Sequence, residues 1–96
     1  MTQQYFSEVF NATITDVVSH KKTKGKPVKE ISFAIERVID PETNEVTMLN
    51  RSSFVREVYD HKKRELSELD LIALRNRRVQ VWVGSDYWII EAMDEN

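Results

Sequence analysis

Several residue types that specialised sites require are missing or scarce in this 96-residue chain. Cysteine is absent, which excludes a disulfide framework and thiolate chemistry. The only glycines, Gly25 and Gly84, cannot form a P-loop or a dinucleotide-binding fingerprint. The only histidines, His20 and His61, lie in highly charged runs, where we expect surface residues rather than a positioned base or a zinc ligand. We therefore predict a non-enzymatic protein with no catalytic residues, no metal and no cofactor.

Long hydrophobic runs are also absent. No apolar stretch approaches the roughly 20 residues of a membrane-spanning helix, and the first residues show no secretory pattern. The formal net charge is −2, so the chain as a whole does not attract nucleic acid or an anionic membrane, and such binding would need a local basic patch. These features predict one cytoplasmic domain over residues 1–96, without membrane contact.

The clearest positive signal is a β-hairpin over residues 79–90. Gly84 and Ser85 are predicted to form a two-residue type II′ turn, with Gly84 at positive φ. This turn sets Trp82 opposite Tyr87 and Arg78 opposite Glu91. The predicted core face carries Val79, Val81, Trp88 and Ile90. The other, mixed face carries Arg78, Gln80, Trp82, Tyr87, Ile89 and Glu91. A slip of one residue would exchange the two faces.

Three strands are expected before this hairpin, over residues 5–19, 28–39 and from 45 to about 54. Short connections with Gly, Pro and Asn make them antiparallel neighbours. The first strand has apolar residues on both faces, which favours a strand that bends. One face carries Phe6, Phe10, Ala12, Ile14 and Val18, and the other carries Tyr5, Val9, Thr13 and Val17. The core face of the second strand carries Ile31, Phe33, Ile35 and Ile39.

Residues 51–65 allow two interpretations: a helix with an exposed middle, or a strand that ends near Val58 and is followed by a charged loop. The next segment is clearer. Ser67 and Asp70 have the spacing of a helix capping box, and Leu66 and Leu71 have the spacing of a hydrophobic staple. We expect a helix that ends near Asn76. Its apolar stripe is predicted to consist of Leu69, Ile72 and Ala73.

The predicted fold is mostly β with one short helix, in the order β-β-β-α-β-β. It is either a small five-stranded barrel or a curled antiparallel sheet. The order resembles an OB-fold barrel. Residues 25–28, Gly-Lys-Pro-Val, leading into residues 31–35, Ile-Ser-Phe-Ala-Ile, resemble the second strand of bacterial single-stranded DNA-binding proteins, as does the charged turn at 40–44. The resemblance implies a ligand face on the second and third strands, although residues 50–53 are more polar than is usual in that family.

Two features are candidates for binding. Residues 20–26 form the only concentrated basic run, which is either a solvated hairpin tip or a loop that contacts phosphates. The pair Trp82 and Tyr87 is a sheet-stabilising pair, a platform for stacked bases, or an anchor for a protein partner.

The leading hypothesis is a module that binds single-stranded DNA or RNA. Its candidate site consists of Lys21, Lys22, Lys24, Lys26, Arg78, Trp82 and Tyr87. The alternative is a small accessory or inhibitor protein, of the kind carried by phages and mobile elements, that binds a host protein. Self-association is compatible with either function.

Overall fold

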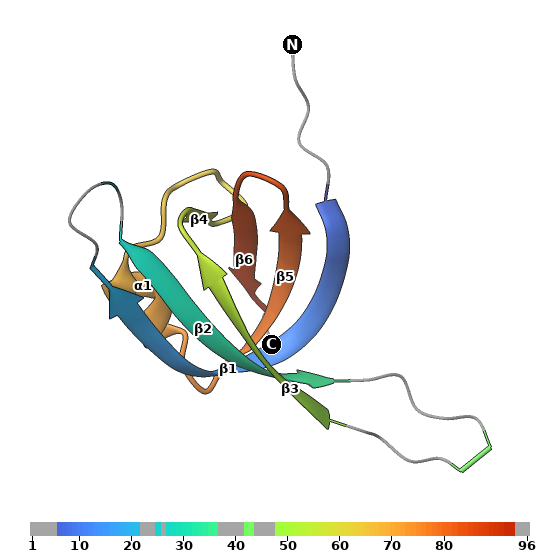
Figure 1. The fold of residues 1–96 in the computed structure, drawn as a ribbon. Coiled ribbons are helices and arrows are strands. Elements are labelled where there is room, and N and C mark those ends of the chain that lie inside the picture. Colours follow the sequence, from blue (N-terminus) through green and yellow to red (C-terminus); the bar gives the residue numbers. More distant parts are fainter. Residues whose placement is uncertain (1–5, 22–24, 26, 37–41, 44–47, 94–96) are drawn as a thin grey trace.

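The computed structural model describes residues 6–21, 25, 27–36, 42–43 and 48–93. These residues form a mostly β structure with one short helix, as predicted (Figure 1). The elements are β1 (Phe6–His20), β2 (Val28–Glu36), β3 (Met48–Val55), β4 (Val58–Tyr59), α1 (Glu68–Ala73), β5 (Arg78–Gly84) and β6 (Trp88–Ala92). No helix in these described ranges is long and apolar enough to cross a membrane.

The strands form one curled sheet in the order β3-β2-β1-β5-β6-β4 (Figure 1). All neighbouring pairs are antiparallel except β4 and β6, which are parallel. The sheet is therefore mixed and has six strands, where five antiparallel strands were predicted. Among the described residues, β3 and β4 are its two edges, so the sheet is not closed into a barrel.

The bend expected in β1 has a local cause. The register with β2 shifts between Ile14 and Asp16, which marks a β-bulge. A bulge adds one residue and reverses the alternation of side chains beyond it. Ile14 is buried before the bulge and Val17 is buried after it, whereas Val18 is 40% exposed. The prediction that Val18 shares a face with Ile14 was therefore wrong.

The core lies inside the curl and joins both halves of the sheet. The Trp88 ring stacks on Phe33 with centroids 6.3 Å apart. The Arg51 guanidinium lies over the rings of Phe10 and Trp88, at 5.4 and 5.9 Å, and is 2.9 Å from a Glu8 carboxylate oxygen. The fully buried side chains include Ile14, Ile31, Phe33, Val58, Leu71, Val79, Val81 and Ile90.

The register of the C-terminal hairpin differs from the prediction by two residues. Val83 lies opposite Trp88, and Trp82 lies opposite Ile89 instead of Tyr87. A shift of two residues preserves the alternation, so the predicted faces are correct for the residues that lie in β5 and β6, whereas Tyr87 lies outside both strands. Gly84 is the last residue of β5 and is not at positive φ, so the predicted type II′ turn was wrong.

Residues 56–66 follow the strand-and-loop interpretation. β3 ends at Val55, β4 covers two residues, and the backbone N–H of Leu66 donates to the carbonyl of Val58 at 2.8 Å. Between them, the Asp60 carboxylate accepts the backbone N–H groups of Lys62 and Arg64, both at 2.9 Å. These hydrogen bonds hold a tight charged turn where a helix was the other possibility.

Both sides of the predicted capping box are present at the start of α1. The Ser67 hydroxyl accepts the backbone N–H of Asp70, and the Asp70 carboxylate accepts the backbone N–H of Ser67. Leu71 is fully buried and Leu66 packs against the core, in agreement with the predicted staple. The box and the staple together orient the short helix against β1.

The apolar stripe predicted for this helix was wrong. Leu69 is 76% exposed and Ile72 is 40% exposed, because the six-residue helix turns Leu71 toward the core instead. The helix also ends at Ala73, earlier than predicted. Asn76 has a φ of 68°, and its N–H donates to the carbonyl of Ile14 at 2.7 Å, which ties the helix exit to β1.

The two tryptophans are expected to differ in their contribution to stability. Trp88 is on the core face and Trp82 is on the other face. Trp88→Ala should lower the free energy of unfolding by about 3–5 kcal/mol, and Trp82→Ala should lower it clearly less. Urea denaturation of both variants measures the difference. A larger loss for Trp82→Ala would contradict the assignment of the faces.

The capping box also predicts sensitivity to acid. The Ser67 backbone N–H, followed by the Ser67 hydroxyl, lowers the pKa of Asp70 below its ordinary value of 3.8. Folding therefore favours the ionised carboxylate. The resulting stabilisation is complete above about pH 4 and is lost as the pH falls through the lowered pKa. Asp70→Asn should flatten this dependence in urea denaturation between pH 2 and 6. Parallel curves for the two proteins would contradict it.

Candidate nucleic-acid interface

The outer face of β1, β2 and β3, turned away from the core, carries an exposed aromatic ring. Val18, Glu30 and Phe54 lie in one row across the three strands. Phe54 is 64% exposed, the most among the large hydrophobic residues of the described strands. An apolar ring held in that position by a regular strand is available to an incoming ligand.

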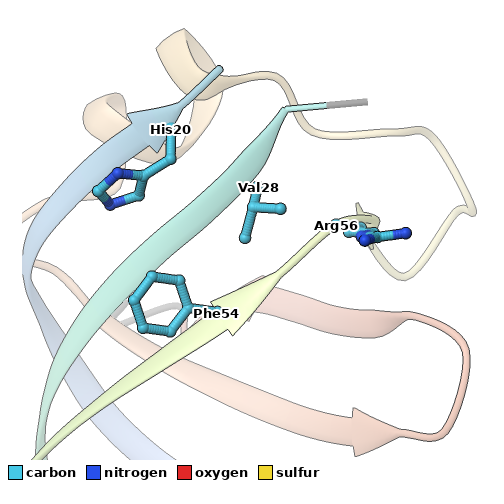
Figure 2. Close-up of a pocket in the computed structure, with 4 residues that line it drawn as sticks. All are labelled: His20, Val28, Phe54 and Arg56. Atoms are coloured by element: carbon cyan, nitrogen blue, oxygen red, sulfur yellow. The ribbon is translucent and has the colours of Figure 1, made fainter. Parts of the chain in front are cut away.

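A shallow hollow of about 420 Å³, here called the Phe54 pocket, lies beside this ring and is lined by His20, Val28, Phe54 and Arg56 (Figure 2). The rings of His20 and Phe54 have centroids 5.6 Å apart and are inclined by 40°. Val28 is buried beneath them. The pocket thus combines two aromatic rings and an aliphatic floor, with Arg56 at its edge and the Arg56 side chain directed away from the rings (Figure 2).

The His20 ring is held in place by Glu30. Its Nε2 atom lies 3.0 Å from the Glu30 carboxylate, and because an ionised carboxylate only accepts, Nε2 donates this hydrogen bond. His20 was predicted to be a surface residue, and its side chain is indeed exposed. Its contact with Phe54 nevertheless makes it part of the candidate site.

Two lysines directly follow residues of the pocket in the sequence. Lys21 follows His20 directly at the end of β1. Lys29 follows Val28, and its ammonium donates to the carbonyl of Arg56 at 3.3 Å. Lys21 and Lys29 line a neighbouring cleft together with Glu65 and Glu68, so two carboxylates accompany the two ammonium groups there. The remaining lysines predicted for the site, Lys22, Lys24 and Lys26, lie outside the described residues.

The structure does not bring the other predicted site residues to this pocket. Trp82 lies on the outer face of β5, opposite Val9, and Arg78 lies opposite Thr13. Val9 and His20 are eleven positions apart on β1, which corresponds to roughly 36 Å along a strand. Two basic and aromatic regions that were predicted as one site are therefore separate.

Tyr87 also lies away from the predicted pair with Trp82. It is in the connection between β5 and β6, and its ring makes edge contacts with Phe6 and Tyr59 at centroid distances of 6.2 and 5.1 Å. The register shift of two residues explains this difference, because it moves Tyr87 out of the strand pair.

Sequence reasoning missed Phe54, His20 and Arg56 as parts of one site. The available signal was Phe54 itself, which alternates with Asn50 and Ser52 on an otherwise polar face of the third strand. The sequence left Phe54 either at the end of the third strand or in a helix, so its exposed face was not identified. The contact between Phe54 and His20 joins residues from strands that are not neighbours in the sheet, so no local pattern reveals it.

Metal binding finds no support in the described part of the chain, where no three His, Asp or Glu residues are grouped in a way that could hold an ion.

Comparison with known proteins finds no family model, no curated protein and no solved structure that matches this chain. The candidate site must therefore be judged on its geometry and chemistry.

Proposed function

We propose that this protein binds single-stranded nucleic acid, with one base stacked on Phe54. The observation that carries the proposal is a ring that is 64% exposed on the sheet, next to His20 and Arg56 in one pocket. Nucleic-acid bases stack on aromatic rings whatever their sequence, and neighbouring Arg and Lys side chains attract the phosphates. A base must be unpaired to expose its face in this way, so the ligand is a single strand.

The arrangement of the strands supports this function. We propose that the sheet is an open relative of the OB barrel, which binds oligonucleotides mainly on its second and third strands. The order β3-β2-β1-β5-β6, with α1 before β5, agrees with that architecture. β4 follows β3 and pairs in parallel with β6, which brings the end of the third strand toward the last one. In this proposal the Phe54 pocket, which is lined from β1, β2 and β3, is the ligand site.

Binding to a labelled single-stranded oligonucleotide, measured by fluorescence anisotropy, tests the proposal. Phe54→Ala should raise the Kd roughly 5- to 150-fold, because one stacked base contributes about 1–3 kcal/mol. Phe54→Tyr keeps the ring and should retain most of the affinity. Leu69→Ala, which truncates an exposed apolar residue on α1, is the matched control and should leave the Kd unchanged.

The affinity should also fall as salt rises, because bound phosphates release counterions. Binding that is undetectable at low salt, or that does not depend on salt, would overturn the proposal. So would equal losses for Phe54→Ala and Leu69→Ala, since that result would place the ligand elsewhere.

A second candidate function, binding of a host protein as an accessory or inhibitor, is favoured by another part of the surface. Val9, Trp82, Ile89 and Tyr59 lie in register across β1, β5, β6 and β4, on the outer face. We call this row the Trp82 patch. Val9 is half exposed. Exposed apolar patches with Trp and Tyr are typical of protein-binding surfaces.

A pull-down from cell extract, with and without added nuclease, separates the two functions. Nucleic-acid binding predicts that captured proteins disappear after nuclease treatment and that Trp82→Ala has no effect on capture. A protein that survives nuclease and is lost with Trp82→Ala would instead support the second function.

A further inference from the structure

Lys29 is a buried cation for which the described residues provide no anionic partner. It is 6% exposed, and its ammonium donates to the carbonyl of Arg56 at 3.3 Å. No carboxylate in the described structure lies within 4.0 Å of this ammonium. An ammonium has three donors, and burying a charge that is poorly compensated is costly. We therefore expect a further hydrogen-bond acceptor beside the Lys29 ammonium.

The ammonium has room for such an acceptor. Lys29 lines a cleft of about 370 Å³ between the ends of β1 and β2 and the segment that leads into α1. Lys21 lines the same cleft, so two ammonium-bearing side chains face it. Glu65 and Glu68 line its other side. Among the described lining residues, the formal charges of two lysines and two glutamates cancel, so a small free anion has little electrostatic attraction to the cleft. An anionic group that belongs to a ligand already bound nearby occupies the cleft more readily, because its effective concentration there is high.

The cleft and the Phe54 pocket are neighbours. Consecutive residues of β1 and β2 alternate between them: Lys21 and Lys29 line the cleft, whereas His20 and Val28 line the pocket. β3 pairs with β2 only as far as Lys29, so beyond this point no described strand covers that edge of β2. Arg56 lies at this edge. Arg56 lines the pocket, and its carbonyl accepts from Lys29. Arg56 therefore connects the pocket to the cleft.

We propose that the cleft binds a backbone phosphate of the strand whose base stacks on Phe54, with Lys29 as the buried anchor and Lys21 as the second cation. This inference rests on the proposed function, and it adds a phosphate site and the direction in which the strand leaves the pocket. Free inorganic phosphate carries the same chemistry and is the alternative source of the anion.

Lys29→Met tests the phosphate site in the full chain. Methionine keeps an unbranched apolar stem, and removing a poorly paired buried charge should leave the unfolding midpoint unchanged or raise it. The Kd for a single-stranded oligonucleotide should rise roughly 10- to 150-fold, as for a lost hydrogen bond to a charged group. The slope of log K against log salt should become shallower by about 0.7, as for one lost phosphate contact.

Two further variants keep the test decisive. Lys21→Met changes an exposed residue and cannot disturb the core, so it should reproduce the shallower slope even if Lys29→Met folds poorly. Lys62→Met removes the same charge from the exposed turn after β4 and should leave both Kd and slope near those of the unmodified protein.

The outcomes distinguish this inference from the function on which it rests. If Phe54→Ala weakens binding while the Lys29 and Lys21 variants keep the full salt slope, the cleft binds no phosphate and the proposed function stands. If the unmodified protein binds no oligonucleotide, both are wrong. If inorganic phosphate raises the unfolding midpoint at constant ionic strength, and Lys29→Met abolishes this shift, the anion is a free phosphate and the proposed strand path is wrong.

Discussion

The architecture of the sheet depends on β1, because this strand joins its two halves. Its first half pairs with β5 and its second half pairs with β2, and only Ala12 and Thr13 pair on both sides. If β1 were regular over its whole length, strict alternation would place the side chains of Ile14 and Val17 on opposite faces. The bulge after Ile14 reverses the alternation of side chains and increases the bend, so Ile14 and Val17 can both be buried in one core.

The same bulge determines the candidate site. It turns Val17 and Ser19 toward the inside of the curl, and it turns Val18 and His20 toward the outer face. Without the extra residue, His20 would share the face of Ile14 and could not reach Phe54. The pocket and the cleft then lie on opposite faces of the same end of β1. For this reason the adjacent residues His20 and Lys21 supply a ring to one site and an ammonium group to the other.

Arg51 explains why a polar third strand is compatible with this core. Its guanidinium covers the faces of Phe10 and Trp88 while its charge is paired with Glu8, so it both packs and remains compensated. On the opposite face of β3, the hydroxyl of Ser52 is hydrogen-bonded to that of Ser32 at 3.0 Å. Arg51 and Ser52 are thus paired with groups of β1 and β2, and the outer face beside Phe54 carries both the polar Ser52 and the partly exposed Val18.

The sequence by itself determined the features that depend on neighbouring residues. The alternation in residues 79–90 correctly separated Trp88 from Trp82, and the spacing of Ser67 and Asp70 correctly placed the start of the helix, because side-chain direction and capping are local properties. The tertiary structure decided the rest. The register of the hairpin depends on its turn, which differs from the predicted one. The reversal in β1 and the meeting of His20 with Phe54 depend on which strands become neighbours, and the packing of the whole core sets the pairing between strands distant in sequence.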